Sequence, residues 1–490
     1  MTLTNLTCER FLYLQKKVSN AKKSPFKFKK SNDKMKLKKD FKGDFNLKFP
    51  KDFVFGVSTA AYQIEGASLV DGAGLCNWDV FSRKKGKVAM GFTGDDGCDH
   101  YYHRKDDIEL LKELGVNAYR FSINWARLIP QGTGKVNKKA VEFYNGIIDK
   151  CLEYGIEPFV TLFHFDFPQS LENKGGFRNP ESPYWMEYYA DTAGKYFGDR
   201  VKSFITINEP QCFLPLGYES GYFPPGIKGY TNEELIPMAH YMLLGHGLAV
   251  KALHKYGCKV GYAPCGDVPV PLTESKEDVE AARKCYFDCS DETWFNSVSW
   301  WSDPVIFGKY PDKPNLYKFL PENWQEDLKT ISEPIDFYCQ NIYGGSYFEH
   351  DEKSERGYKK RNKLTGLTAN KTTVVPQAVY WGSKFLCERY KKPFYITENG
   401  MSGTDWVQLD GKVHDPQRCD YIERYLTELS KAIEDGVDIR GYMHWSFLDN
   451  FEWASAYRER FGLVFVDYET KKRIPKDSFY KYKEIIAKSK

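Results

Sequence analysis

The chain has 490 residues, a net charge of +4 and an aromatic content of 16%. That length allows one large domain or two or three ordinary ones. Thirteen Lys or Arg and only four Asp or Glu fall within residues 1–45, so the remainder is mildly acidic, which argues against a nucleic-acid-binding main domain. No stretch approaches roughly eighteen apolar residues, so we expect no membrane span.

The basic segment at residues 1–45 contains few clustered apolar residues. Its composition predicts a disordered N-terminal arm, with a membrane, polyanion or targeting role as the alternative. The first twenty residues lack the apolar region of a secretory signal, because FLYL at residues 11–14 is short and Lys16 and Lys17 end it. Twelve scattered cysteines without zinc-site spacing favour a reducing compartment, so we expect a cytoplasmic protein.

Eight short apolar runs, rich in aromatic or β-branched residues, recur at long intervals and are predicted to be strands. In chain order they are FVFGVSTA (53–60), NAYRFSINW (117–125), IEPFVTLFH (156–164), SFITINEP (203–210), KVGYAPC (259–265), DFYCQNIYG (336–344), PFYITENG (393–400) and IRGYMHWSF (439–447).

Amphipathic stretches between these runs are predicted to be helices, among them residues 107–115, 139–155 and 420–436. Each ends in a glycine, as expected where a left-handed residue turns the chain back toward the next strand. A strand and a helix repeated eight times are typical of an α/β fold of the (β/α)8 TIM-barrel type. Two separate doubly wound domains are the alternative.

We find no linker or change of composition after residue 50, so residues 46–490 are predicted to form one (β/α)8 catalytic domain. Long strand-to-helix loops build the site of such a barrel at its C-terminal end. The long loops are expected at residues 64–106, 166–183, 213–233, 300–335 and 344–375.

Two of the predicted strands end in a carboxylate, Glu209 in TINEP and Glu398 in ITENG. On a barrel both side chains would point into the same mouth. Two converging carboxylates serve glycoside hydrolysis, one as acid/base and one as nucleophile or base. The alternative is that each glutamate is a paired structural residue of the barrel mouth.

Other strand ends carry side chains that offer hydrogen bonds or flat apolar faces, which a sugar ring needs. They are Gln63, His164, Asp166, Asn341, Tyr343, Trp445, Glu452 and Trp453. No metal site or cofactor is predicted, because the histidines lack partnering carboxylates at recognised spacing and no phosphate-binding glycine loop or Gly-x-Ser-x-Gly motif is present.

With these residues assembled, the chain closely resembles glycoside hydrolase family 1, the β-glucosidase-like enzymes, from about residue 46 onward. The motifs that carry the resemblance are FVFGVSTAAYQIEG, TINEP, ITENG, HWSFLDNFEW and RFGLVFVD, in that order. The resemblance implies a retaining mechanism with Glu398 as nucleophile and Glu209 as acid/base. It assigns a sugar-binding role to Gln63, His164, Asn208, Trp445, Glu452 and Trp453, and makes Tyr343 a hydrogen-bond partner of the nucleophile.

The resemblance also bears on the substrate. Members that use 6-phosphorylated sugars replace the Glu-Trp pair, whereas Glu452 and Trp453 are present here and a carboxylate repels a phosphate. Plant thioglucosidases of the family lack the acid/base glutamate, so O-glycosides are expected. Two departures from the family pattern, Phe165 in place of a tryptophan and Thr372 in place of an aglycone-site tryptophan, bear on gluco/galacto preference and on the leaving group.

The sequence therefore predicts a β-glucosidase that removes terminal non-reducing β-D-glucosyl residues from short oligosaccharides or small β-glucosides, with tolerance of β-galactosides or β-fucosides. The expected partner is a small carbohydrate, and the sequence makes no prediction about oligomeric state. The alternatives are a silent sugar-binding protein on the same barrel and a 6-phospho-β-glycosidase, which Phe165 alone supports. Transglycosylation onto alcohols is a variant of the leading prediction.

Overall fold

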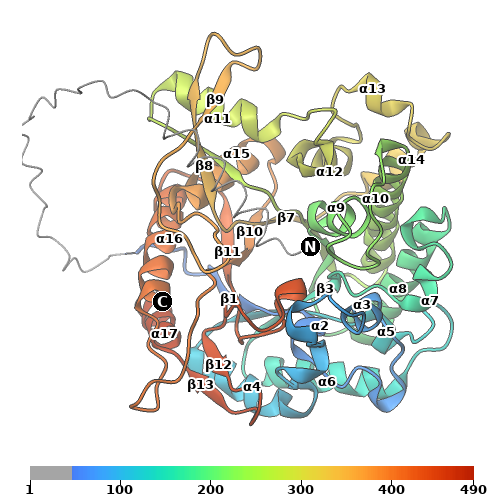
Figure 1. Cartoon of the computed structure of the whole chain (residues 1–490), viewed down its shortest axis with the longest axis vertical. Coiled ribbons are helices and arrows are strands. Elements are labelled where there is room, and N and C mark those ends of the chain that lie inside the picture. Colours follow the sequence, from blue (N-terminus) through green and yellow to red (C-terminus); the bar gives the residue numbers. More distant parts are fainter. Residues whose placement is uncertain (1–46, 490) are drawn as a thin grey trace, which may run out of the picture. The chain divides into compact units, whose positions relative to one another are not determined.

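The computed structural model describes residues 47–489, and eight parallel strands close into a barrel at its centre (Figure 1). Neighbouring strands follow one another in chain order, and the last pairs with the first. The strands are β1 (Val54–Ser58), β2 (Ala118–Ser122), β3 (Glu157–Phe163), β4 (Ser203–Asn208), β5 (Lys259–Ala263), β7 (Phe337–Asn341), β10 (Phe394–Asn399) and β11 (Ile439–Trp445). All eight predicted strands and the barrel are confirmed, and a closed barrel excludes the two-domain alternative.

The predicted basic arm at residues 1–45 lies outside the described residues. So does the N-terminal stretch on which the prediction of a cytoplasmic location depends. The boundary between the arm and the catalytic domain stays a prediction.

The strands form because their side chains are buried on both faces. Inside the barrel, seven apolar side chains from six strands form a compact cluster. They are Ala118, Phe159, Ile205, Ala263, Phe337, Cys339 and Met443. The opposite faces of the strands pack against the helices in a much larger core. This packing fixes the directions of the strands, and therefore of the side chains at their ends.

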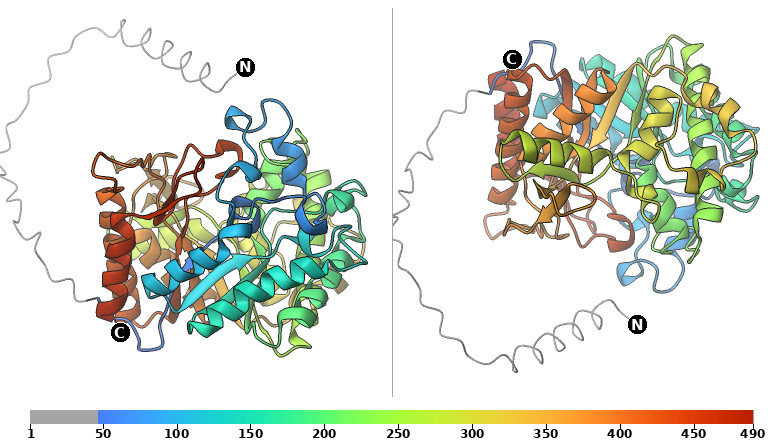
Figure 2. Two further views of the ribbon diagram at one scale, coloured as in Figure 1. Left: turned by 90° about the horizontal axis from the view of Figure 1, so that it is seen from below. Right: turned by 90° about the horizontal axis from the view of Figure 1, so that it is seen from above.

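Each barrel strand is followed by a helix of the outer layer, which surrounds the strands (Figures 1 and 2). These helices are α4 (His100–Leu114), α6 (Lys138–Glu153), α8 (Ser182–Phe197), α10 (Asn232–His254), α14 (Trp324–Ile331), α15 (Gln377–Tyr390), α16 (Pro416–Glu434) and α17 (Asp477–Ser489). Figure 1 shows α16 and α17 on one side of the barrel and α8 and α10 on the other. Within residues 47–489, every helix is too short or too polar to cross a membrane.

The three predicted helix ends are confirmed. Gly115, Gly155 and Gly436 follow α4, α6 and α16 with φ angles of +83°, +69° and +84°. Glycine has no Cβ, so it adopts this left-handed conformation without steric cost.

The expectation that residues 300–335 form a loop is wrong. This segment holds the end of α12 (Val298–Phe307), the short helix α13 (Pro314–Tyr317) and α14. WQEDLKTI, the sequence of α14, places its apolar residues at helical spacing and buries Leu328 and Ile331. The expected loop at residues 344–375 also carries two strands, β8 (Gly345–His350) and β9 (Tyr358–Arg361). They form a small separate sheet in which β8 lies between β9 and β6 (Val268–Pro271).

Gly400, just after β10, provides a test of how tightly the barrel mouth is packed. A Cβ at this position would lie 1.7 Å from the carbonyl oxygen of Trp445. We therefore expect Gly400→Ala to destabilise the protein by about 1–3 kcal/mol through overpacking. Gly146, inside α6, meets only the tip of Arg104 at 3.8 Å, so Gly146→Ala should stabilise by about 0.5–1 kcal/mol. Thermal unfolding followed by circular dichroism should show Tm shifts of opposite sign, and equal Tm values would contradict the packing argument.

Candidate active site

The backbone turns sharply at Glu209, immediately after β4. Glu209 has a φ of +44°, and Pro210 begins the helix α9 (Pro210–Tyr218). Left-handed backbone costs about 1–2 kcal/mol for an L-residue. A hydrogen bond from the Glu209 amide to the Ala263 carbonyl, at 2.8 Å, holds the turn against β5. The sequence TINEP therefore ends the strand and presents the carboxylate at the C-terminal end of the barrel.

Both strands that lead to the glutamates contain one extra residue. Ile396 and Glu398 on β10 pair with the consecutive residues Gln340 and Asn341 on β7. A regular strand would turn Glu398 to the same side as Ile396, which packs in the outer core. The extra residue is Thr397, and the irregularity turns Glu398 toward the barrel axis instead. The hydroxyl of Thr397 donates to Asn341 at 2.7 Å.

The corresponding irregularity in β4 lies between Ile205 and Asn208. These residues pair with Gly261 and Ala263 on β5, so three steps along one strand match two along the other. Because Ile205 and Ala263 both belong to the cluster inside the barrel, the extra residue places Asn208 on the inside as well.

A buried arginine joins the two strands that carry the glutamates. Arg120 on β2 is completely buried, and its Nη1 donates to Glu398 Oε1 at 2.6 Å while its Nη2 donates to Asn208 Oδ1 at 2.6 Å. Its Nε donates to the hydroxyl of Thr161 at 3.0 Å, which fixes the plane of the guanidinium. The geometry leaves Glu398 facing a permanent cation.

Asn341, at the end of β7, completes the link between the two glutamates. Its Nδ2 donates to Glu209 Oε1 at 2.8 Å and to Asn208 Oδ1 at 3.0 Å. The hydroxyl of Tyr343 donates to Glu398 Oε2 at 2.7 Å. One hydrogen-bonded network therefore runs from Glu209 to Asn341, Asn208, Arg120 and finally Glu398.

Aromatic rings form one wall of the site. His164 lies nearly parallel to Trp445, with ring centroids 5.7 Å apart, and 6.1 Å from Trp453. Phe165, which has a φ of +73°, packs against Trp453 at 5.1 Å. Burial and the charge of Arg120 hold the pKa of His164 well below its usual value, so the ring is neutral. Its Nδ1 is buried without a hydrogen-bond partner among the described residues.

Gln63 and Glu452 provide polar atoms beside this wall. Gln63 Nε2 donates to Asn450 Oδ1 and to the Phe451 carbonyl, both at 2.9 Å, and lies 3.5 Å from Glu452 Oε2. Gln63 Oε1 is buried without a protein partner among the described residues. Since the donor end is held by protein, the acceptor end is left for a donor such as a sugar hydroxyl.

Asp166 does not join this network, although the sequence predicts it at the same strand end. It is fully buried, and burial followed by the charges of Glu65 and Asp79 raises its pKa well above the usual value. Its two carboxylate oxygens have no hydrogen-bond partner among the described residues, so it takes no part in holding the two glutamates.

The sequence model of glycosyl hydrolase family 1 matches residues 45–490. The chain belongs to this family. Beta-glucosidase A of Thermotoga maritima is 43% identical over 446 residues, which cover 90% of this chain and 98% of the relative. Beta-glucosidase A of Acetivibrio thermocellus is 40% identical over 454 residues, with coverages of 90% and 98%. A solved structure of a T. maritima beta-glucosidase in complex with glucoimidazole has a TM-score of 0.82 and 42% identity, covering 90% of this chain and 99% of that one.

The two glutamates of this family 1 hydrolase differ in their affinity for a proton. Burial raises the pKa of Glu209 to about 7, and the negative charge of Glu398 adds to the shift. Burial also raises the pKa of Glu398, but Arg120 and Tyr343 oppose it by stabilising the ionised form. The environments thus assign the proton to Glu209 and the negative charge to Glu398.

Sequence reasoning missed Arg120 and one group of metal-ligating side chains. A signal for Arg120 was available, because it is a charged residue within the apolar run NAYRFSINW. Among residues 47–489, Glu209, Cys212 and Cys265 form the one group of three side chains close enough to hold a metal ion. They are far apart along the chain, so spacing gave no indication of this group.

Tyr343 provides a test of how the charge on Glu398 is maintained. Its hydroxyl stabilises the carboxylate, so Tyr343→Phe should raise the pKa of Glu398. If Glu398 must be ionised for reaction, the acid limb of the pH profile of kcat/KM should move to higher pH. The profile of an aryl β-glucoside measures this limb in the free enzyme. Tyr395→Phe, inside the barrel on the same strand as Glu398, is the control and should leave the limb in place; a shift in both variants or in neither would contradict the assignment.

Proposed function

We propose that the chain is a retaining β-glucosidase, which removes the terminal non-reducing β-D-glucosyl residue from short oligosaccharides and small β-glucosides. The observation that carries the proposal is the single hydrogen-bonded network that joins Glu209 and Glu398 and gives the two side chains different affinities for a proton. The names of the relatives from T. maritima and A. thermocellus support the substrate class.

In the proposed first step, Glu398 attacks the anomeric carbon while Glu209 gives its proton to the leaving oxygen. Such a direct attack requires carboxyl groups roughly 5–5.5 Å apart. The glycosyl ester removes the negative charge of Glu398, and this charge helps to raise the pKa of Glu209. The pKa of Glu209 therefore falls, and the carboxylate left after it has given its proton to the leaving group stays ionised. It can then take a proton from the water that releases the sugar in the second step.

Asn208 is proposed to bind the sugar 2-hydroxyl. Arg120 and Asn341 both donate to its Oδ1, and its Nδ2 lies 3.3 Å from His164 Nε2. The second hydrogen of Nδ2 is therefore the one left to donate to substrate. A hydrogen bond to this hydroxyl strengthens as the ring approaches an oxocarbenium-like transition state. Trp445, Trp453 and His164 supply flat faces for the ring, and Gln63 and Glu452 supply polar atoms.

The charges around Glu452 favour unphosphorylated sugars. Burial and the negative charges of Glu459 and Glu398 raise the pKa of Glu452 well above its usual value. The same burial and negative charges that disfavour an ionised Glu452 would disfavour a phosphate group, which carries up to two negative charges. Phe165, which favours the 6-phospho alternative in the sequence, contributes only an apolar ring against Trp453.

Tolerance of β-galactosides or β-fucosides and transfer to alcohols are proposed as side activities. A change of configuration at one sugar hydroxyl alters contacts with Gln63 and Glu452 but not with Glu209 or Glu398. The leaving-group preference involves the segment around Thr372, whose amide is held by Thr368 and Asn370.

The substrate class can be tested with nitrophenyl β-glucoside, β-galactoside and 6-phospho-β-glucoside. We expect kcat/KM for the glucoside to exceed that for the phosphorylated sugar by at least about 100-fold, because juxtaposed like charges cost several kcal/mol. Glu452→Gln preserves the shape and cannot ionise, so it should reduce this ratio. A preference of the wild type for the phosphorylated substrate would overturn the proposal, and a ratio unchanged by Glu452→Gln would show that Glu452 does not set it.

The roles of the two glutamates can be separated with variants and azide. Glu209→Ala should lose about 10²–10⁴-fold on poor leaving groups and far less on dinitrophenyl glucosides, which need no proton. On substrates with poor leaving groups, kcat/KM of the wild type should decline above about pH 7 as Glu209 loses its proton, and Glu209→Ala should lack this decline. Added azide should yield the β-glycosyl azide from Glu209→Ala and the α-glycosyl azide from Glu398→Ala, as judged by NMR. The reverse pair of products would exchange the two roles.

A further inference from the structure

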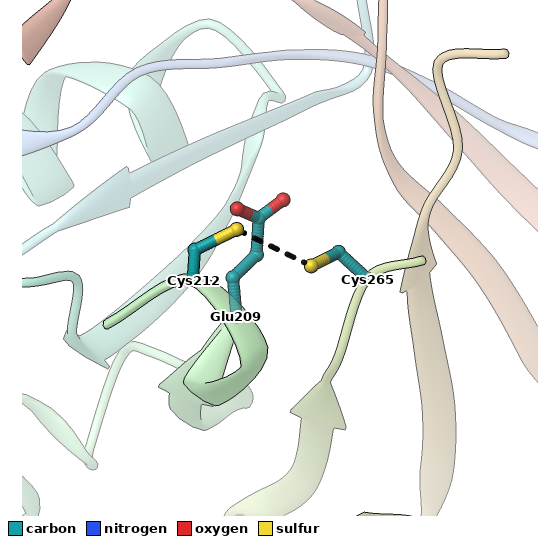
Figure 3. Close-up of side chains that lie close together, drawn as sticks. All are labelled: Glu209, Cys212 and Cys265. Carbon is teal, nitrogen blue, oxygen red and sulfur yellow. Dashed lines mark hydrogen bonds between the residues drawn. The ribbon is translucent and has the colours of Figure 1, made fainter. Parts of the chain in front are cut away.

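Two thiols lie beside Glu209 on the side where α9 begins (Figure 3). Cys212 is in the first turn of α9, and Cys265 follows β5. Their sulfur atoms are 3.6 Å apart, and each lies within 4.8 Å of a carboxylate oxygen of Glu209. All three side chains are half-buried, so solvent reaches the group.

We propose that Glu209, Cys212 and Cys265 form a binding site for a thiophilic divalent cation such as Zn²⁺, and that occupation of this site inhibits the enzyme. The cation site itself stands apart from the proposed hydrolysis. Its inhibitory effect depends on the proposed role of Glu209 as acid/base.

The spacing of the two sulfur atoms suits a shared ion. With Zn–S bonds of about 2.3 Å, a sulfur separation of 3.6 Å gives an S–Zn–S angle of roughly 100°, close to tetrahedral. A disulfide would require the same atoms to approach to about 2.05 Å. The side chains can therefore hold a metal ion with smaller movements than they would need to form a bond with each other.

The ligand types determine which ions fit. Two thiolates and one carboxylate match the preference of Zn²⁺ and Cd²⁺, whereas Mg²⁺ and Ca²⁺ prefer oxygen ligands alone. Three protein ligands leave a fourth tetrahedral position for water. Each thiol that binds the ion releases its proton to solvent, and Glu209, whose pKa is raised to about 7, releases its proton where it is still protonated. Binding of one M²⁺ therefore displaces two thiol protons and up to one carboxyl proton, and forms two metal–sulfur bonds and one metal–oxygen bond.

The backbone around the three ligands is already held in place. The amide of Cys212 donates to the Glu209 carbonyl at 2.9 Å, within the first turn of α9. Gln211 Nε2 donates to the Cys265 carbonyl at 3.0 Å, which ties the end of β5 to α9. Asn341 holds Glu209 through Oε1. The ion therefore has little chain to order when it binds.

A bound cation would act directly on the proposed acid/base. It stabilises the ionised form of Glu209, so the proton needed by the leaving oxygen is lost. Because Glu398 and Arg120 lie outside the group of three ligands, the nucleophile keeps its own partners. Inhibition should therefore be most severe for substrates whose leaving groups require protonation.

The test uses the full chain, reduced and freed of metal by a chelator that is then removed, and titrated with Cd²⁺ and separately with Zn²⁺. We expect a sulfur-to-cadmium charge-transfer absorption that saturates at one ion per chain and a chelator-reversible loss of nitrophenyl β-glucoside hydrolysis. Two protons should be released well above pH 7 and close to three below it, because Glu209 then gives up its proton as well. Cys265→Ser should keep the metal-free activity and lose at least about tenfold in metal affinity. Glu209→Gln should keep the absorption and bind more weakly.

Cys387→Ser is the matched control, because Cys387 is also half-buried but lies on α15 outside the group of three ligands. It should bind and respond like the wild type. The proposal is overturned if no charge-transfer band appears, if Cys265→Ser is inhibited at the same metal concentration as the wild type, or if the treated protein has instead lost two thiol hydrogens to a disulfide. A band without inhibition would overturn the regulatory part, whereas absence of hydrolysis in the metal-free wild type would count against the proposed function alone.

Discussion

The site is organised around the buried ion pair between Arg120 and Glu398. Removing two charges from water is expensive, so such a pair is stable only when further hydrogen bonds satisfy both partners. Here Asn208 and Thr161 bind the remaining edges of the guanidinium, and Tyr343 binds the second carboxylate oxygen. The same bonds that satisfy the charges also fix the positions of residues from β2, β3, β4, β7 and β10.

This arrangement explains how one barrel end can hold two glutamates with different protonation. Arg120 donates directly to Glu398 and compensates its charge. Glu209 has no such direct ion pair: it is held by Asn341 and by the thiol of Cys212, and it lies in the field of the neighbouring anion. The two glutamates differ in protonation because Arg120 lies beside Glu398 and not beside Glu209. The difference does not require that one carboxylate be more buried than the other. A neutral His164 adds no competing positive charge to the sugar side of the site.

Most of the fold was predictable because strand, helix and glycine signals recur regularly along the chain. The convergence of Glu209 and Glu398 followed from their positions at strand ends, since a barrel brings those ends together. Contacts that depend on the direction of a side chain were not predictable. Asp166 stands at a strand end but makes no hydrogen bond to the glutamate network. Cys212 and Cys265 are far apart along the chain, yet their sulfur atoms are 3.6 Å apart. The helices in residues 300–335 were missed because their short periodic runs are interrupted by prolines and glycines.

The extra residues in β4 and β10 have a consequence for how barrel sequences are interpreted. Each insertion reverses the inward and outward order of side chains one or two residues before a functional group. A carboxylate that seems to face the helical layer, judged by counting from the apolar residues before it, can therefore face substrate. In barrels without a recognisable motif, the first residues to examine are acidic ones at strand ends. Those that break the alternation of inward-facing and outward-facing side chains are the strongest candidates.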